Sequence, residues 1–318
     1  MNCIGLRPYL AVITRTVARP TRRQQTVAQT IRSLAVWCVL ALTAMSALCQ
    51  QAIPAPTQLW PGMRYEELTI TGEIPALVHI VEIALKTPGL RFAVTPADRS
   101  QGMEYTARLT STYLEERHAQ LAINAMYFLP FRGGKNGTGF YPHVGEPVNV
   151  SGAALSDGQT VSPVETDLDP RVDAMLCFRH AEGTIVDGQQ CPAEFLDGVA
   201  AGPRLLKQGQ IVPSTLDYYL KPQPRTAFGL SSNRDKAWIV VVDGRQPGSV
   251  GMTGPELSRV LLRLGASDAI NLDGGGSSTL VVEGKDGRAK ILNRVMQAGV
   301  LGMERPVANH LLVFVPHQ

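Results

Sequence analysis

The chain has 318 residues, of which 44% are hydrophobic and 18% are charged, and its formal net charge is +3. This composition is typical of a globular protein and excludes a largely disordered one. Six arginines lie before residue 33, where no acidic residue occurs, so the rest of the chain has a formal charge of −3 and offers no basic patch for nucleic acid.

The basic leader precedes an apolar run from Leu34 to Cys49. This run is shorter than the roughly 20 residues of a membrane-spanning helix and suits the core of a signal peptide. We therefore predict a signal peptide with a long basic n-region at residues 1–50 and a linker at residues 51–63. An uncleaved anchor is the alternative. Both readings export the body of the protein, and the first makes it periplasmic or secreted, with no stable membrane insertion after signal cleavage.

Cysteine usage agrees with export. Three of the five cysteines lie in the leader, which leaves Cys177 and Cys191 in the body on either side of a hairpin-like stretch. Such a pair favours a disulfide in an oxidising compartment, and two buried free thiols are the alternative.

The first half of the body is predicted to be rich in strands. Short apolar or alternating stretches indicate strands at residues 65–71, 77–85, 90–95, 120–124, 173–178 and 183–187. Residues 106–117 have a helix-like pattern. Residues 131–146, rich in glycine and aromatic residues, are predicted to be a loop long enough to suggest a functional role.

The last third has the clearest pattern. A buried strand at residues 237–242 precedes a helix that Thr253 caps, with Glu256 at the spacing of a capping box and Gly265 as the stop signal. Further strands are predicted at residues 269–272, 279–282 and 309–315. Because strands and helices alternate without a regular period, we predict a single α+β domain over residues 64–318, with a mixed β-sheet and flanking helices.

Three adjacent glycines, Gly274, Gly275 and Gly276, follow the strand at residues 269–272. Glycines are costly to order, so we expect that these positions need positive φ values or a close approach of another group to the backbone. Consecutive amides of such a loop form an anion-binding nest. Ser277 and Ser278 would add hydroxyl donors. A tight turn without a ligand is the alternative. The loop lacks the lysine of a phosphate-binding P-loop and the following helix of a dinucleotide-binding motif.

Polar residues gather at the ends of the predicted strands: Asn124, Asp243, Asn271 and Asp273. Each alone is more often a turn former, but together they are typical of the lining of a cleft. Arg225 and Arg305 are available to bind an anion bidentately. This set suits an anionic substrate cleaved by acid–base or nucleophilic carboxylate chemistry.

The segment from Ala269 to Thr279 (AINLDGGGSST) resembles the hallmark of the phosphodiester glycosidase family. Five other blocks follow the family's order: Ile123-Asn124-Ala125 ahead of Tyr127-Phe128, Gly202-Pro203, Pro224-Arg225-Thr226-Ala227, Asp243-Gly244-Arg245 and Arg305-Pro306-Val307-Ala308-Asn309. The resemblance covers residues 68–315. One departure is Met126-Tyr127, where the family usually has glycine and an aromatic residue, and the bulkier Met126 would narrow a sugar pocket.

The resemblance implies cleavage of a sugar-1-phosphodiester at the anomeric carbon of the sugar. It implies Asp273 or Asp243 as nucleophile or base, and Asn124 and Asn271 as ligands of sugar hydroxyls. The predicted substrate-binding set is completed by Arg225, Gly274, Gly275, Gly276, Ser277, Ser278, Arg305 and Asn309, with the phosphate on the arginines and the loop amides.

No metal or other cofactor is expected, because the six histidines lack metal-ligand spacing and are read as satisfied core or surface residues. Ser277 and Ser278 lie outside the motif of a serine hydrolase. The rival hypothesis is a non-catalytic protein that binds an envelope polymer or assists exopolysaccharide assembly. Two carboxylates beside an anionic ligand favour the enzyme, since they would weaken simple binding.

Overall fold

The structure is a computed structural model, and it describes residues 56–132, 141–165 and 169–316, all within one compact unit. The predicted signal peptide lies outside the described residues. Part of the predicted linker is folded, because residues 57–60 form the first strand. No helix in the described ranges is both long enough and apolar enough to cross a membrane.

The described residues form several antiparallel sheets and three short α-helices. The predicted α+β class is therefore only partly right, because the fold is mainly β. The predicted mixed sheet is wrong. Hydrophobic patterning does not encode strand direction, and many consecutive strands here are joined by short turns, which favour antiparallel pairing.

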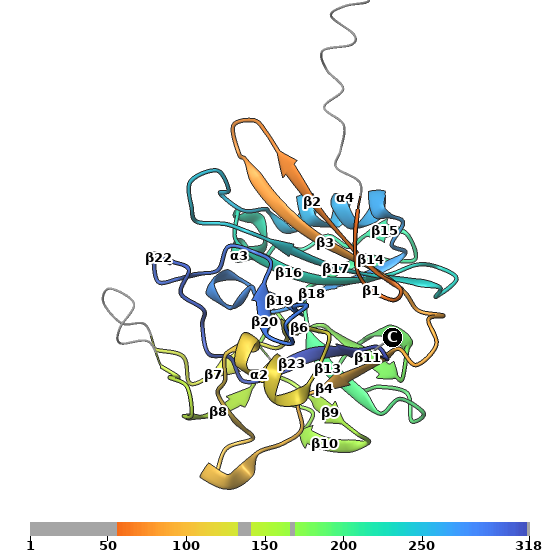
Figure 1. The fold of residues 1–318 in the computed structure, drawn as a ribbon, viewed down its shortest axis with the longest axis vertical. Helices are drawn as coiled ribbons and strands as arrows, with labels where there is room; N and C mark the ends of the chain where they lie inside the picture. Colours follow the sequence, from red (N-terminus) through yellow and green to blue (C-terminus); the bar gives the residue numbers. More distant parts are fainter. Residues whose placement is uncertain (1–55, 133–140, 166–168, 317–318) are drawn as a thin grey trace, which may run out of the picture. The chain divides into compact units, whose positions relative to one another are not determined.

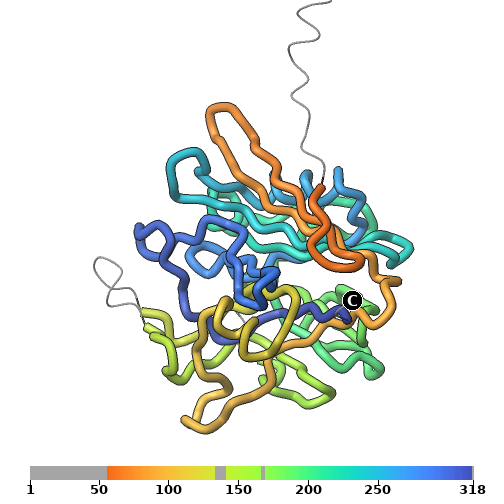
Figure 2. Tube along the Cα trace, in the orientation of Figure 1, coloured from red at the N-terminus to blue at the C-terminus, as the bar shows by residue number. Residues whose placement is uncertain are grey.

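The largest sheet has eight strands in the order β1-β2-β3-β17-β16-β18-β14-β15 (Figure 1). Its strands are β1 (Thr57–Trp60), β2 (Met63–Ile70), β3 (Ala76–Ala84), β17 (Lys236–Val242), β16 (Arg225–Leu230), β18 (Asp268–Asn271), β14 (Arg204–Lys207) and β15 (Gln210–Ile211). The β2–β3 hairpin lies beside β17, far from it in the chain, as the tube in Figure 2 shows.

Two further sheets have five strands each. One contains β10 (Gln159–Ser162), β9 (Ala154–Ser156), β13 (Asp197–Ala201), β11 (Ala174–Arg179) and β12 (Glu182–Asp187) in that order. The other contains β20 (Ala289–Ile291), β19 (Leu280–Glu283), β6 (Leu121–Asn124), β23 (His310–Phe314) and β4 (Arg91–Val94). Smaller sheets pair β21 (Met296–Gln297) with β22 (Val300–Leu301), and β8 (Pro147–Val150) with both β5 (Tyr105–Thr106) and β7 (Phe128–Leu129).

The main core lies where the three large sheets meet. Phe92 on β4, Phe178 on β11 and Phe228 on β16 contribute one aromatic ring from each sheet. Their ring centroids are 4.3 Å apart for Phe92 and Phe178 and 5.3 Å apart for Phe178 and Phe228. Successive residues of β16 and β17 are buried, so the opposite face of the eight-stranded sheet is also apolar and needs its own cover.

Helix α4 (Gly254–Leu264) covers that opposite face (Figure 1). The predicted capping box of Thr253 and Glu256 is confirmed, and Gly265 ends the helix in the left-handed conformation, as predicted. Helix α2 (Thr110–Arg117) begins later than predicted, because Tyr105 and Thr106 pair with β8 instead. The remaining helices are α3 (Asp217–Leu220) and the 3₁₀ turns η1 (Arg99–Gln101) and η3 (Gly275–Ser277).

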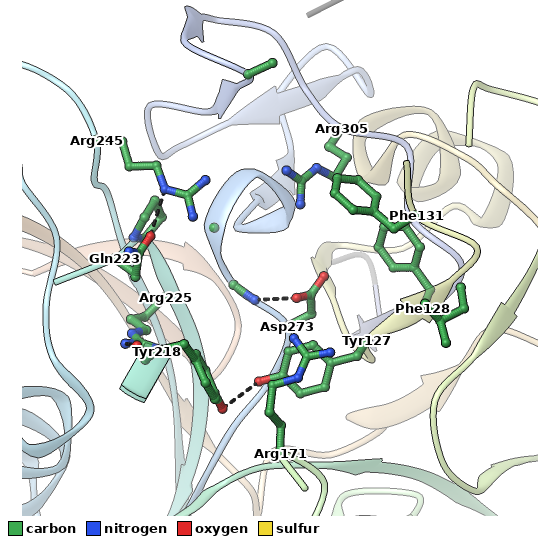
Figure 3. Close-up of a pocket in the computed structure, with 15 residues that line it drawn as sticks. Tyr127, Phe128, Phe131, Arg171, Tyr218, Gln223, Arg225, Arg245, Asp273 and Arg305 are labelled. Atoms are coloured by element: carbon green, nitrogen blue, oxygen red, sulfur yellow. Dashed lines mark hydrogen bonds between the residues drawn. The ribbon is translucent and has the colours of Figure 1, made fainter. Parts of the chain in front are cut away.

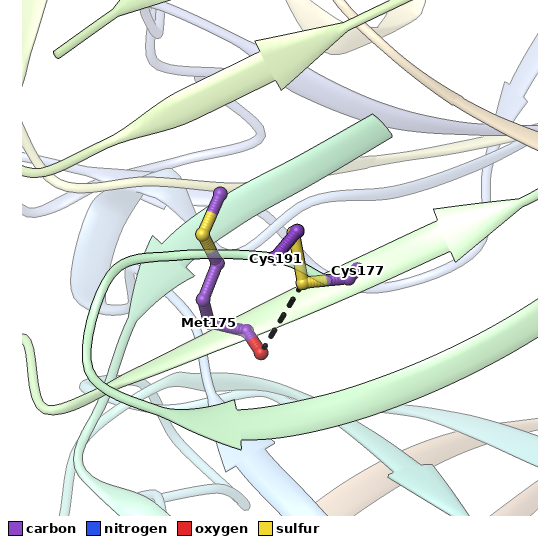
Figure 4. Close-up of a disulfide and its surroundings, with 3 residues drawn as sticks. All are labelled: Met175, Cys177 and Cys191. Carbon is purple, nitrogen blue, oxygen red and sulfur yellow. Dashed lines mark hydrogen bonds between the residues drawn. A yellow bond between two sulfur atoms is a disulfide. The ribbon is translucent and has the colours of Figure 1, made fainter. Parts of the chain in front are cut away.

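The predicted disulfide between Cys177 and Cys191 is confirmed, with Cα atoms 5.7 Å apart (Figure 4). Cys177 lies in the middle of β11, and Cys191 follows β12. A Cβ atom on Gly198 of the neighbouring strand β13 would collide with the sulfur of Cys191. The glycine therefore makes room for the bridge between the two chain segments.

Candidate active site

Asp273, just beyond the end of β18, lies in the wall of a cavity of about 580 Å³ (Figure 3). Its backbone is fixed from both sides, because its amide donates to the carbonyl of Ala125 and its carbonyl accepts from Asn124. The cavity is lined by Tyr127, Phe128, Leu129, Phe131, Arg171, Tyr218, Gln223, Pro224, Arg225, Arg245, Asp273, Gly274, Gly275, Ala298 and Arg305.

The cavity is cationic and aromatic. Among the described residues that line it, the ionisable groups are four arginines, one carboxylate and two tyrosines. Arg245 and Arg305 lie on either side of the glycine loop, and Arg171 approaches from the opposite side of the cavity (Figure 3). Tyr127 and Tyr218 join through a hydroxyl–hydroxyl contact of 3.1 Å. The combination suits an anion attached to a ring that packs on aromatic faces.

Burial raises the pKa of Asp273 above its ordinary value, because desolvation disfavours the charged form. Arg305, the Ser277 hydroxyl and Arg171 oppose this effect, as does the Gly274 amide, which donates to Oδ1 over 2.9 Å. Burial also lowers the pKa of Arg305 to about 10, which leaves it protonated at neutral pH. The site therefore combines a carboxyl group whose pKa is raised with a charged guanidinium.

Arg225 lines the cavity as predicted, but its guanidinium is largely used by the protein. It is 2% exposed, and it donates through Nε to the carbonyl of Met252 and through Nη2 to the carbonyls of Tyr218 and Lys221. Arg225 therefore adds positive charge to the wall, while most of its donors are already taken. Arg171 is anchored by Asp169 and lies 4.1 Å over the ring of Tyr127.

The three predicted asparagines lie behind the cavity and do not line it. Asn124 accepts from the hydroxyl of Thr226 at 2.9 Å and donates to Asp273, so it ties two sheets to the site. Asn271 donates to the Tyr127 hydroxyl over 3.0 Å, and Asn309 accepts from the amide of Met126. Their positions support the backbone of the site and offer no side-chain atom to a sugar.

The glycine loop does not form the predicted row of free amides. The amides of Gly274, Gly275, Ser277 and Ser278 each donate within the protein. Gly275 has a φ of 62°, and a Cβ atom on Gly276 would lie 2.5 Å from Nη2 of Arg305. The glycines therefore permit a turn and the close approach of guanidinium groups, so the arginines supply the positive charge here.

Asp243 is separated from the cavity and does not line it. Its side chain is 1% exposed, with Oδ2 3.2 Å from Nε2 of His79 and Oδ1 accepting from the amide of Arg294. Nδ1 of His79 lies 2.8 Å from the hydroxyl of Tyr65. His79 is thus a partnered core histidine, as predicted, and Asp243 is buried beside it.

Several lining residues escaped the sequence reasoning, namely Arg171, Tyr218, Gln223 and Arg245, together with Gln297 behind Arg305. Arg245 carried a signal, since it ends the Asp243-Gly244-Arg245 block. Arg171 and Gln223 lie in connecting segments, whereas Tyr218 lies in the short helix α3 and Gln297 in the two-residue strand β21. All four segments are too short for a periodic pattern, and only the fold brings these residues to the cavity.

A pocket with one carboxyl group among arginines and aromatic rings suits an anionic small molecule. The chain belongs to the phosphodiester glycosidase family, whose model matches residues 117–314. The suspected family membership is thereby confirmed.

Solved structures show the same fold. The catalytic domain of zebrafish N-acetylglucosamine-1-phosphodiester alpha-N-acetylglucosaminidase, auto-inhibited by its pro-peptide, matches with a TM-score of 0.59 at 19% identity, over 82% of this chain and 86% of that chain. A putative exported protein from Burkholderia pseudomallei matches with a TM-score of 0.54 at 16% identity, over 76% and 74% of the chains. At these identities the likeness establishes the fold alone.

A curated relative is the SPbeta prophage-derived uncharacterized protein YomE of Bacillus subtilis. It is 37% identical over 93 residues, which are 29% of this chain. The matched region spans 13% of the length of that relative.

Proposed function

We propose that the protein is an exported hydrolase that cleaves a glycosyl phosphodiester at the anomeric carbon and releases the sugar. The observation that carries the proposal is the cavity in which Asp273 is the carboxylate among four arginines. Membership of the phosphodiester glycosidase family supports the substrate class. The alternative of a non-catalytic binding protein leaves the poised carboxyl group without a role.

The proposed reaction breaks the bond between the anomeric carbon and the phosphate oxygen. The electron pair of that bond stays on the oxygen, so the leaving group is a phosphate monoester. Asp273 either attacks the anomeric carbon and forms a glycosyl ester that water then hydrolyses, or it acts as the base that takes a proton from the attacking water. Arg245 and Arg305 hold the phosphate, and their charge stabilises the oxygen that departs. The sugar ring packs on the aromatic side chains that line the cavity.

Export is part of the proposal. The Cys177–Cys191 disulfide is typical of proteins that fold in an oxidising compartment. The likeness to a protein described as exported and the signal-peptide pattern at residues 1–50 point the same way. The proposed location is the periplasm or the exterior of the cell.

The test uses paired variants of the two predicted catalytic aspartates. Purified protein is incubated with a panel of sugar-1-phosphodiesters, including nucleotide sugars, and free sugar is measured. We expect Asp273→Asn to lower the rate about a thousandfold while the protein stays folded. Asp243→Asn serves as the matched variant, and we expect it to lower stability, because Asp243 is buried against His79.

Two outcomes would contradict the proposal. Full activity in Asp273→Asn would remove the assigned carboxylate. Absence of sugar release from every diester, with a folded wild-type protein that still binds phosphorylated glycans, would favour the non-catalytic alternative.

A further inference from the structure

Two glutamines hold the two arginines that flank the glycine loop. Nε of Arg245 donates to Oε1 of Gln223 over 2.8 Å, and Nε of Arg305 donates to Oε1 of Gln297 over 2.7 Å. Arginines near a protein interior are commonly held by a carboxylate, which cancels their charge. Glutamine fixes the guanidinium through the same kind of hydrogen bond and leaves its charge intact.

The glycine loop completes this arrangement. A Cβ atom on Gly275 would lie 3.0 Å from Nη2 of Arg245, and one on Gly276 would lie 2.5 Å from Nη2 of Arg305. The guanidinium of Arg305 also donates from Nη1 to the Ser277 hydroxyl over 3.2 Å. Both guanidiniums therefore lie against the loop next to Asp273, Arg305 half-buried and Arg245 exposed, and each donates to a glutamine.

Among the described residues, neither arginine forms an ion pair, and Asp273 is the carboxylate whose charge acts on both. Arg171 is paired with Asp169, whereas Arg225 forms no ion pair among the described residues and adds further positive charge to the cavity. Asp273 alone cannot balance the guanidiniums of Arg225, Arg245 and Arg305, so the cavity is arranged for more than one negative charge. A phosphodiester carries one negative charge, whereas a phosphate monoester carries close to two above its second pKa of about 6.

We propose that Gln223 and Gln297 are positioning residues that keep Arg245 and Arg305 oriented and uncompensated, so that the site binds a phosphate monoester dianion more tightly than a diester monoanion. The inference rests on the proposed function, in which the second charge develops as the bond to the anomeric carbon breaks. An interaction that strengthens as this charge develops lowers the barrier, whereas one that binds the substrate and the transition state equally well does not. The two glutamines thereby act on the reaction through the arginines.

The first experiment compares two probes by titration calorimetry. Methyl phosphate gains its second charge near pH 6, and dimethyl phosphate remains a monoanion. We expect methyl phosphate to bind about tenfold more tightly than dimethyl phosphate at pH 7.5, and the ratio to approach one at pH 5. Protonation of Asp273 strengthens binding of both probes in acid, so the ratio of affinities isolates the effect of the ligand charge. Equal affinities at pH 7.5 would overturn the inference.

The second experiment introduces Gln297→Glu and Gln223→Glu. Each glutamate accepts the same hydrogen bond but adds a negative charge beside the arginine. We expect each variant to lose about tenfold in affinity for methyl phosphate at pH 7.5, with a smaller loss for dimethyl phosphate. Gln210→Glu on the exposed edge strand β15 is the matched control, and its affinities should equal those of the wild type.

A purely structural role for the glutamines predicts the opposite result, since glutamate preserves the hydrogen bond. Unchanged affinity in both variants would therefore overturn the inference. Gln223 is only half-buried, so Gln223→Glu decides the question if Gln297→Glu fails to fold. Binding is measured without turnover. If the wild-type protein hydrolyses no diester, that result counts against the proposed function alone. If it binds the two probes with equal affinity, that result counts against this inference alone.

Discussion

Asp273 illustrates a conflict between stability and chemistry at one residue. Burial raises its pKa, so the fold favours the neutral carboxyl group, while the proposed reaction needs the charged form. Arg305 and Arg171 reduce this conflict without removing it. Ionisable residues whose pKa is shifted by burial are common at active sites, where their charged form acts on the substrate.

The sign of the effect gives a prediction for Asp273→Asn. A raised pKa in the folded state means that wild-type stability is lost as pH rises through that pKa. The asparagine variant lacks this loss, so its melting temperature relative to wild type should rise between pH 3 and neutral pH. Thermal unfolding of both proteins across this range measures the difference. A difference that stays constant with pH would show that ionised Asp273 costs no folding energy.

At the scale of elements, helix α4 shows what local sequence can determine. Its first turn carries a complete capping box, in which the Thr253 hydroxyl accepts from the Glu256 amide and the Glu256 carboxylate accepts from the Thr253 amide over 2.8 Å. Leu257, Val260 and Leu261 then face the eight-stranded sheet. The capping residue, the apolar stripe and the glycine that ends the helix all lie within residues 253–265, so the local sequence is enough to predict this helix.

We predict that Thr253→Ala destabilises the protein by about 1 kcal/mol, since one amide of the first turn loses its acceptor. Urea unfolding of the variant and the wild type gives the difference. Glu256→Gln is the control, because glutamine still accepts from the Thr253 amide and should cost less. An equal loss in both variants would contradict the assignment of the larger cost to the lost acceptor of the Glu256 amide.

The same reasoning explains which elements could be predicted from the sequence. The long apolar strands around residues 77–85 and 237–242 and the loop after residue 272 were found, because their patterns are local. Short strands such as β9 and β13 were missed, since Ala154–Ser156 and Asp197–Ala201 give little apolar signal. The acceptors that occupy the loop amides include the carbonyl of Pro224, whose proximity only the tertiary fold creates. The positions of Arg171 and Gln297 at the site likewise depend on the tertiary fold and cannot be predicted from local patterns.

At the scale of the whole molecule, the disulfide ties the β11–β12 hairpin to the segment that follows it. The two cysteines are separated by 14 positions in the chain. Closing a loop of this size reduces the conformational entropy of the unfolded chain, which raises the free energy of unfolding.

We predict that replacing both cysteines with alanine lowers the free energy of unfolding by about 3 kcal/mol. Urea unfolding with and without a reducing agent measures the effect. The reducing agent should destabilise the wild type and leave the double variant unchanged. A wild type insensitive to complete reduction would show that the packing of the hairpin, rather than the bridge, stabilises this region.

The position of β23 has a consequence for how the chain is made. This strand lies between β6 and β4 in its sheet, so residues 310–314 join segments made much earlier in synthesis. Until the ribosome has passed this point, both early strands expose an unpaired edge, and no order of domain-by-domain folding avoids that state. A chain cut before β23 should therefore leave β4 and β6 without the strand that joins them in the sheet.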